Sequence, residues 1–292
     1  MFNMYSFFES YYEGVNFFYK LEDYMLGNLN NKIALITGGG QGLGLGIVKR
    51  MAEQGADIVI ADINNNNTLD AKEIVEKLGN SAWTSYMDVT DKLSIKNSIE
   101  EIISNTKRID ILVNNAGVAG AAGSTGTFFR DIDWEFTWKV NVKGVADVTE
   151  AVLPYMLKRK YGKIINISSV AARAAKYTTA YYATTKMSVI AYTQALAREF
   201  ASQNINVNAI APGRIWTAFH QDWMEERDKL GDDVVKGRDR YEVFLESLRE
   251  VIPMGRPQTP SDIGALAAFL ASEDASNITG QTIQCDGGQV MV

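Results

Sequence analysis

Short apolar runs recur along most of the chain, and longer amphipathic stretches separate them. The runs predict buried strands at Ile33–Thr37, Ile58–Ala61, Trp83–Met87, Ile111–Asn114, Lys163–Ile167, Asn206–Ile210 and Thr282–Gln284. The stretches between them predict helices at Leu43–Gln54, Thr68–Leu78, Leu93–Asn105, Trp134–Lys158, Tyr182–Ser202 and Ser261–Leu270. Strands that alternate with helices of this length form parallel sheets through right-handed crossovers. We therefore expect an α/β fold, a doubly wound parallel sheet of about seven strands with helices on both faces.

Residues 1–29 stand apart from this pattern because phenylalanine and tyrosine crowd them. A short helix, packed on its own domain or on a neighbouring subunit, is predicted from the helical spacing of Phe8, Tyr12, Val15 and Tyr19. A helix on a membrane surface and a true start near Met25 are alternatives. Asn28–Asn31 is expected to be a linker, so that residues 30–292 form a single domain.

Two segments inside that domain carry further signals. Asn64–Asn67 predicts a turn, with Thr68 as the N-cap of the helix that follows. Residues 214–251 are long and mixed in composition, and they predict two short helices that form a small lid over a cleft.

Composition excludes several classes of protein. The chain has 292 residues and a net charge of −6, which argues against a nucleic-acid partner because such proteins need a basic patch. The only cysteine is Cys285 and the only histidine is His220, so we expect no internal disulfide, no metal site and no Ser-His-Asp triad. No run of apolar residues is long enough to span a membrane, and Glu9 and Glu13 do not suit a signal peptide. We expect a cytoplasmic protein that binds neither nucleic acid nor membrane.

The first strand runs into a glycine-rich turn that precedes an amphipathic helix, Gly38-Gly-Gly-Gln41-Gly42-Leu43-Gly44. Glycines allow the backbone to turn sharply and to approach a pyrophosphate, and the helix N-terminus adds N–H groups and a favourable dipole. At the first strand-to-helix crossover, this pattern predicts a Rossmann-type dinucleotide site. A glycine turn that binds nothing is the alternative.

The second strand ends in Asp62, about 20 residues beyond the glycines. A carboxylate there accepts from both ribose hydroxyls of an adenosine and repels a 2′-phosphate. Gln41 and Ile63 stand where a basic residue would be needed for that phosphate, so the sequence favours NAD over NADP. Asp88 follows the third strand and is expected either to accept from the adenine amino group or to cap a helix.

Four further motifs follow in order, Asn114-Asn-Ala-Gly117, Asn141, Ile167-Ser-Ser169 and Tyr182-Ala-Thr-Thr-Lys186. Together with Thr37 and the glycine turn, they resemble the short-chain dehydrogenase/reductase family from about residue 30 to the end of the chain. The resemblance implies a Rossmann-fold catalytic domain that transfers hydride to or from a nicotinamide cofactor.

Tyr182 and Lys186 are four residues apart, so they share a helix face. A nearby ammonium and the positive ring of an oxidised nicotinamide lower the pKa of a phenol, which suits Tyr182 as the acid or base of the reaction. Ser169 can donate to the substrate oxygen as charge develops. Tyr181 and Ser168 are adjacent candidates. The lysine four residues on selects Tyr182, and the family's Ser-to-Tyr spacing selects Ser169.

The resemblance implies roles for individual residues. The catalytic set is Asn141, Ser169, Tyr182 and Lys186; Lys186 also holds the nicotinamide ribose, and Asn141 holds a water that connects Lys186 to solvent. The cofactor-binding set is Gly38, Gln41, Gly42, Leu43, Gly44, Asp62, Asp88, Val89, Asn115, Ala116, Gly117, Tyr182, Lys186, Pro212, Gly213, Ile215 and Thr217.

The substrate walls are expected from three variable stretches, Val118–Arg130, Val170–Tyr177 and Arg214–Val251. Ser169, Trp216 and His220 are substrate-contact candidates, although His220 suits a solvated lid residue better than a catalytic group. The lid has charges of both signs, which favours a polar, hydroxyl-rich substrate.

The sequence thus predicts an NAD-dependent enzyme that interconverts a secondary alcohol and a ketone on a sugar, polyol or small hydroxyketone. A hydroxysteroid dehydrogenase, a 3-oxoacyl-(acyl-carrier-protein) reductase and a non-catalytic NAD-sensing regulator are the alternatives. The glycine-bounded tail around Gly280 and Gly288 is similar to that of family members that form tetramers. A homotetramer is therefore expected, with a dimer as the fallback.

Overall fold

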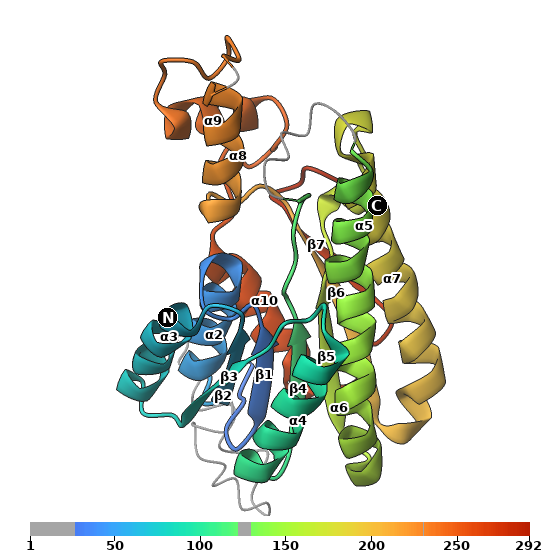
Figure 1. Ribbon diagram of the computed structural model, residues 1–292. Helices are drawn as coiled ribbons and strands as arrows, with labels where there is room; N and C mark the ends of the chain where they lie inside the picture. The colour runs from blue at the N-terminus through green and yellow to red at the C-terminus, as the bar shows by residue number, and fades with distance from the viewer. Residues whose placement is uncertain (1–26, 122–129, 230) are drawn as a thin grey trace, which may run out of the picture.

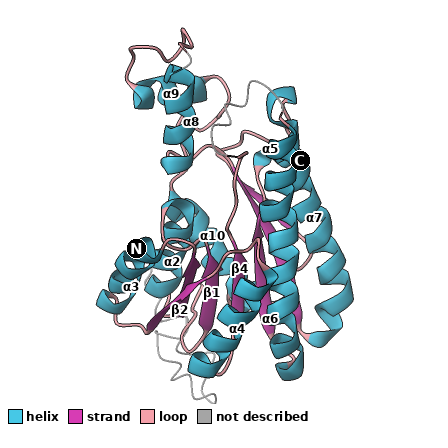
Figure 2. Cartoon of the chain, viewed as in Figure 1, coloured by secondary structure: helices cyan, strands magenta, loops and turns pink. Residues whose placement is uncertain are grey.

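The computed structural model describes residues 27–121, 130–229 and 231–292. They form a seven-stranded parallel sheet in the order β3-β2-β1-β4-β5-β6-β7, with helices on both faces (Figures 1 and 2). The strands are β1 (Ile33–Thr37), β2 (Asp57–Asp62), β3 (Ala82–Tyr86), β4 (Ile111–Asn114), β5 (Gly162–Ile167), β6 (Ile205–Pro212) and β7 (Thr282–Cys285). The doubly wound α/β fold predicted from the sequence is confirmed.

The long helices divide between the two faces of the sheet. One face carries α2 (Gly42–Glu53), α3 (Asn65–Lys77) and α10 (Pro260–Ala271). The other carries α4 (Lys92–Thr106), α6 (Val145–Arg159) and α7 (Ala180–Phe200). Short 3₁₀ turns complete the connections at η3 (Val170–Ala172), η4 (Tyr177–Thr179), η5 (Ala201–Gln203) and η6 (Glu273–Ala275).

Alternate side chains along the strands point to opposite faces of the sheet, so each face has its own hydrophobic core. In β1, Ala34 and Ile36 pack with α2 and α10, whereas Ile33 and Leu35 pack with α4 and α6. All five residues of β1 are buried, as expected for a central strand covered on both faces. The sheet is therefore rigid at its centre, and the carboxyl ends of its strands meet at one edge.

The predicted helix over residues 134–158 is continuous but changes character along its length. It begins as α5 (Asp131–Trp138), passes through the π-helical turn η2 (Lys139–Gly144) and continues as α6. Asn141 lies in that π-helical turn, a feature that often marks functional sites.

The start of α3 corrects a prediction. Thr68 is not its N-cap, because the helix begins at Asn65 and the Asn64 side chain accepts from the backbone N–H groups of Asn66 and Asn67. The segment predicted as a turn thus supplies the first helical residues. Asparagine is as good an N-cap as threonine, so residue type did not separate the two positions.

The predicted linker at 28–31 is part of the packed domain. Leu29 is fully buried in the core beside α2 and α10, and its N–H donates to the Gln54 carbonyl at 2.8 Å. Gly27 N–H donates to the Asp274 carboxylate at 2.8 Å. Residues 1–26, with the predicted aromatic helix, lie outside the described residues.

Two helices stand above the carboxyl edge of the sheet, α8 (Ala218–Lys229) and α9 (Arg240–Arg249) (Figure 1). Met224 of α8 and Phe244 of α9 belong to a small apolar cluster that is separate from the two main cores. We call the segment 214–251, without residue 230, the lid.

Candidate active site

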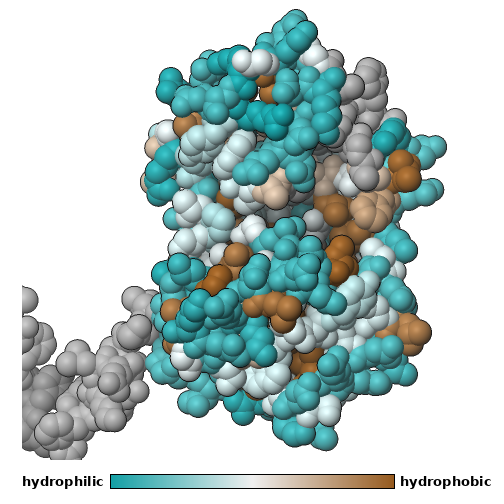
Figure 3. Space-filling model, turned by 60° about the vertical axis from the view of Figure 1, so that its left-hand side comes forward, coloured by the Kyte–Doolittle hydropathy of each residue, from teal (hydrophilic) through white to brown (hydrophobic). Residues whose placement is uncertain are grey.

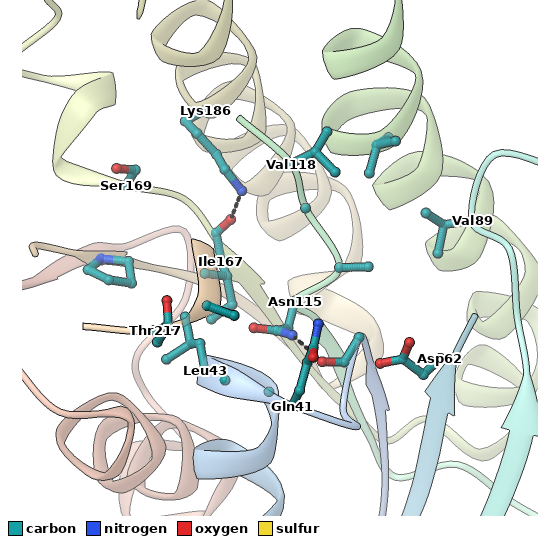
Figure 4. A pocket seen from close by; sticks show the side chains of 18 of the residues that line it. Gln41, Leu43, Asp62, Val89, Asn115, Val118, Ile167, Ser169, Lys186 and Thr217 are labelled. Carbon is teal, nitrogen blue, oxygen red and sulfur yellow. Dashed lines mark hydrogen bonds between the residues drawn. The ribbon is translucent and has the colours of Figure 1, made fainter. Parts of the chain in front are cut away.

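A cavity of about 490 Å³ opens at the carboxyl edge of the sheet, and its volume is typical of sites for small molecules and cofactors. The surface is hollowed between the lid helices and the body below them (Figure 3). Ser169 and Thr217 lie toward one end of the cavity, and Asp62 and Val89 lie at the other (Figure 4). An elongated ligand could therefore extend from β2 to the lid.

The glycine-rich turn forms the floor of this cavity between β1 and α2. Gly38 has a φ of +62°, and a Cβ at Gly44 would overlap the Gly38 carbonyl oxygen, so both positions require glycine. Asn115 Nδ2 fixes the turn by donating to the carbonyl oxygens of Thr37 and Gly38 at 2.9 Å each. Gln41 precedes α2 and makes no side-chain cap, so the N–H groups of the first turn suit an anion.

Asp62 lies on the cavity wall at the end of β2. One of its carboxylate oxygens accepts from Gly40 N–H at 3.1 Å and the other from Asn64 N–H at 3.0 Å, which orients the side chain. Lys186 is the only lysine or arginine among the described residues that line the cavity, and it comes from α7. The lining near Asp62 therefore holds no cation for a 2′-phosphate among these residues.

Asp88 lines the cavity but caps no helix. Its carboxylate accepts from the N–H and the hydroxyl of Thr90, at 2.8 Å each. The N-cap of α4 is Asp91, whose side chain accepts from Leu93 N–H. The helix-cap alternative for Asp88 is thus wrong, and its cavity-facing position fits the predicted contact with adenine.

Tyr182 is the third residue of α7, and it lines the cavity together with Ser169, which follows β5. The two side chains are hydrogen-bonded to each other, and Ser169 Oγ also accepts from Ala171 N–H at 3.1 Å. Burial raises the pKa of the Tyr182 phenol, and the hydrogen bond with Ser169 offsets part of that rise. The shift is thus upward in this structure, whereas the sequence argument predicts a lowering by Lys186 together with the positive ring of an oxidised nicotinamide.

Lys186 lies one helical turn after Tyr182, with Nζ 5.7 Å from the centre of the tyrosine ring. Its Nζ donates to the Ile167 carbonyl at 2.9 Å (Figure 4), and the neighbouring Ser168 Oγ donates to the Lys186 carbonyl at 2.8 Å. Burial lowers the pKa of Lys186 to about 8. Ser168 thus anchors α7 to β5, which leaves Ser169 as the serine that bonds Tyr182.

Asn141 is completely buried and holds the chain that follows β4. Its side chain accepts from Val118 N–H at 2.9 Å and donates to the Val118 carbonyl at 2.8 Å. A Cβ at Gly117 would stand 3.2 Å from both Asn141 Oδ1 and Lys186 Nζ, so a larger residue there would crowd both side chains. Asn141 itself does not line the cavity; it positions residues that do.

Two more side chains bind the same segment. The Tyr181 hydroxyl donates to the Ala119 carbonyl at 3.0 Å, and the buried Asp133 carboxylate accepts from Ala121 N–H at 2.9 Å. Arg130 binds Asp133 through two N–H groups and holds the pKa of that carboxyl below its usual range. Residues 118–121 are thus held by side chains from three helical segments. Tyr181 thus holds residues 118–121 in place, whereas Tyr182 lines the cavity.

The lid contributes less to the cavity than the sequence suggests. Trp216 does not line it; its ring packs on Tyr241 and Phe244, with centroids 5.3 and 5.0 Å away. His220 does line it, and it is not the solvated residue expected from the sequence, because its ring packs against Phe244 at 5.4 Å. Burial and the neighbouring Arg214 lower the pKa of His220 to about 4.

The charges of the lid pair with one another. Arg240 binds Glu225 and Asp228, and Arg238 binds Glu246, so these side chains link α8, α9 and the loop between them. None of them lines the cavity. The mixed charge of the lid therefore does not indicate a hydroxyl-rich substrate, which corrects that step of the sequence argument.

Every residue predicted to bind the cofactor lies on the wall of this cavity, as do Ser169, Tyr182, Lys186 and His220. Sequence reasoning missed other lining residues, among them Ile63, Met87, Thr90, Phe136 and Val140. Phe136 and Val140 lie four residues apart, so they share a helix face, and Val140 directly precedes Asn141.

The residues present fit a nicotinamide dinucleotide. The glycine turn admits no side chains where the pyrophosphate would lie, and Asp62 stands at the adenosine end. Thr217 lies over the turn, because a Cβ at Gly42 would stand 3.7 Å from its Cβ. Lys186 and Thr217 would hold the nicotinamide end.

A family model described as enoyl-(acyl carrier protein) reductase matches residues 38–289. The chain belongs to the short-chain dehydrogenase/reductase family. The 3-oxoacyl-[acyl-carrier-protein] reductase of Thermotoga maritima is 36% identical over 263 residues, which cover 90% of this chain and 99% of that protein. The oxidoreductase UcpA of Escherichia coli K12 is 37% identical over 269 residues, 91% of this chain and 97% of that protein.

Solved structures of this family are similar over nearly the whole chain. NAD⁺-bound xylitol dehydrogenase has a TM-score of 0.80 and 30% identity, covering 89% of this chain and 99% of its own. Levodione reductase has a TM-score of 0.80 and 29% identity, covering 90% and 98%. The fold and the oxidoreductase class of this short-chain dehydrogenase/reductase are therefore established, whereas its relatives differ in substrate.

Two absences concern the described residues only. None of their helices combines the length and the apolar character needed to cross a membrane. No group of three or more histidine, cysteine, aspartate or glutamate side chains is arranged there to hold a metal ion.

Proposed function

We propose that this chain is an NAD-dependent dehydrogenase/reductase that interconverts a secondary alcohol and a ketone on a small, non-polymeric substrate. The observation that carries the proposal is the cavity wall itself. It brings the hydrogen-bonded pair Tyr182 and Ser169 together with Lys186, at the end of the cavity away from Asp62. A non-catalytic NAD sensor would have no need of this set.

The residues divide the work of the reaction between them. When bound, a nicotinamide nucleotide supplies the hydride donor or acceptor. Ser169 is positioned to hydrogen-bond the substrate oxygen, and Tyr182 exchanges a proton with it. The raised pKa of Tyr182 keeps the phenol protonated at neutral pH, which suits proton donation to a ketone. Proton removal from an alcohol needs a positive charge nearby, and Lys186 supplies it.

Asp62 supports NAD as the preferred cofactor. Its carboxylate is held in place by two backbone N–H groups at the adenosine end, where it would accept from ribose hydroxyls and repel a 2′-phosphate. Xylitol dehydrogenase, the NAD⁺-bound relative, gives independent support through its overall similarity.

A 3-oxoacyl-(acyl-carrier-protein) reductase is the second candidate. A relative with that name is 36% identical over 90% of this chain, and the matching family model also has an acyl-carrier-protein description. Cofactor preference and substrate tests separate this activity from that of a dehydrogenase for polyols, hydroxyketones or hydroxysteroids.

The experiment is an absorbance assay at 340 nm with NAD(H) and NADP(H). Its substrates are xylitol, small diols, a hydroxysteroid and a 3-oxoacyl thioester. We expect NAD-linked turnover of the small diols or polyols. NADPH-linked turnover confined to the thioester would favour the second candidate, and NADH binding without turnover of any substrate would favour a sensor.

We further propose that the protein is a homotetramer, with a dimer as the alternative. β7 is the last strand of the sheet, and all four of its residues are only partly buried in the isolated chain. An edge strand of this kind favours cover by a neighbouring subunit. Light scattering should give a multiple of the 32.3 kDa chain mass, and a mass near that of one chain would overturn the proposal.

A further inference from the structure

The asparagine run Asn64–Asn67 lies beside the adenosine end of the cavity, and the proposed reaction gives it no role. The run directly follows Ile63, which lines the cavity, and its first residue donates its N–H to Asp62 at 3.0 Å. Its last residue packs against the glycine turn, because a Cβ at Gly40 would stand 2.8 Å from the Asn67 Cβ and 3.1 Å from an Asp62 carboxylate oxygen. The run therefore lies where α3, the glycine turn and Asp62 meet.

The N-terminus of α3 differs from that of α2. The first turn of a helix offers N–H groups and a positive dipole to an anion, and in α2 the preceding Gln41 makes no side-chain cap. In α3, the Asn64 side chain accepts from Asn66 N–H at 3.1 Å and from Asn67 N–H at 3.4 Å, while the N–H of Asn64 itself is bound by Asp62. These three N–H groups are thus satisfied within the protein, so α3 is less open to an anion than α2.

The Gln41 side chain lines the cavity and is held by a residue that does not. Asn67 Nδ2 donates to Gln41 Oε1 at 3.0 Å, and Asn67 itself lies off the cavity wall. Gln41 lies between Leu43 and Asp62 in the view of Figure 4. A glutamine amide that rotates freely can turn its NH₂ group toward a phosphate, whereas this amide is anchored through its oxygen. The hydrogen bond therefore ties the glycine turn to α3 and restricts the one side-chain amide that the turn presents.

We propose that the run Asn64–Asn67 is a second determinant of cofactor selectivity, which acts against NADP by engaging the donors that a 2′-phosphate would need. Asn64 and Asn67 are positioning residues, since Asn64 occupies N–H groups of α3 and Asn67 holds Gln41. This inference rests on the proposed function and extends the selection that Asp62 makes. The carboxylate repels the phosphate by its charge, and the asparagines withhold the charge-assisted hydrogen bonds that would offset the repulsion.

Binding of NADH and NADPH to the full chain, without substrate, tests the proposal. The two cofactors differ only in the 2′-phosphate, so the ratio of their dissociation constants isolates its contribution. Titration calorimetry measures both constants, and the fluorescence of the reduced nicotinamide gives a second reading of each. For the native protein, we expect NADPH to bind at least about 10-fold more weakly than NADH.

Asn64→Ala uncovers N–H groups of α3, and Asn67→Ala releases Gln41. Each variant should bind NADPH about 3- to 10-fold more tightly than the native protein and keep NADH affinity within about 3-fold. Asn67→Asp keeps a hydrogen-bonding partner for Gln41 and adds a negative charge, so it should weaken NADPH binding instead. Asn65→Ala is the control, because Asn65 is an exposed member of the same run whose side chain takes part in none of these hydrogen bonds. Thermal melting of each variant shows whether it is folded.

The outcomes separate this inference from the proposed function. A native preference for NADH that stays constant in both alanine variants would overturn the inference and leave the selection to Asp62, with the proposed function intact. Equal weakening of NADH and NADPH would mean that the run only supports the glycine turn, which also overturns it. A native protein that binds NADPH as tightly as NADH would instead overturn the NAD preference of the proposed function, and this inference with it.

Discussion

The two ends of the cavity are held by different kinds of structure. At the adenosine end, Asp62 and the glycine turn belong to β2 and to the β1–α2 crossover, whose backbone is fixed by the sheet. At the substrate end, residues 118–121 and the lid have no strand partners over most of their length, and side chains such as Asn141 and Tyr181 hold them. The backbone pairing of the sheet thus positions the cofactor end, whereas side-chain hydrogen bonds position the substrate end. Substitutions should therefore separate cofactor binding from substrate binding.

Tyr182→Phe should have the largest effect. Loss of the phenol removes the proton exchange but no part of the adenosine end, so turnover should fall by about 10³-fold while NADH binds normally. Steady-state rates at 340 nm and NADH fluorescence titration measure the two quantities. Tyr86→Phe is the control, because Tyr86 ends β3, is 53% exposed and does not line the cavity. Turnover within a few-fold of the native value would remove Tyr182 from the reaction.

Asp62→Ala should change cofactor preference at the adenosine end and leave the substrate end unchanged. Hydrogen bonds to a charged group are worth about 1.5–3 kcal/mol, so the ratio of kcat/KM for NAD to that for NADP should fall by about 10- to 100-fold. Asp57→Ala is a matched control at the opposite end of β2, where the carboxylate accepts from Ser81 N–H. If the ratio stays constant in Asp62→Ala, the ribose is bound elsewhere.

The difference between the two ends of the cavity also explains which features the sequence could predict. The strand β1 ends where apolar periodicity and the glycine turn place it, and Asp62 follows directly from the end of β2. These features depend on residues close together in the chain. The first turn of α3 escaped prediction because the run from Asn64 to Asn67 has no apolar period, and only the hydrogen bonds of Asn64 select it as the cap.

The substrate end depends on contacts between residues far apart in the chain. His220 has a polar neighbour in Gln221 and looks solvated in the sequence, yet Phe244 of α9 covers its ring. Arg238 and Arg240 look available to a substrate, yet they pair with Glu246 and Asp228. A local sequence pattern does not indicate such pairings between distant residues. The predicted cofactor residues, which depend on local patterns, therefore line the cavity, whereas Trp216 does not.

His220 provides a pH-dependent test of the substrate end. Its pKa is about 4 in the folded chain against 6.5 as the ordinary value, so between these pH values the unfolded chain binds more protons. Folding stability therefore falls as the pH drops from 6.5 toward 4, by about 1–2 kcal/mol between pH 7.5 and 5. Urea unfolding at several pH values should show a smaller loss in His220→Asn than in the native protein. Because the chain has one histidine, parallel curves would mean that His220 is solvated after all.

Tyr181→Phe should have the smallest effect and is the most direct test of how the substrate end is held. The variant keeps the buried ring and removes the hydrogen bond to the Ala119 carbonyl, so the free energy of unfolding should fall by about 1 kcal/mol. Tyr192→Phe is the matched control on α7, because its hydroxyl is hydrogen-bonded to Thr149. Both variants should lose similar stability, measured by urea unfolding.

Only Tyr181→Phe should raise KM for the alcohol, by a few-fold, because Ala119 follows Val118, which lines the cavity. NADH affinity should stay constant in both variants, since neither hydroxyl contacts the glycine turn or Asp62. An equal rise in KM in both would mean that general loosening of α7, rather than the position of residues 118–121, controls substrate binding. A change in NADH affinity would contradict the independence of the two ends, because it would show that the wall after β4 transmits its position to the cofactor turn through Asn115.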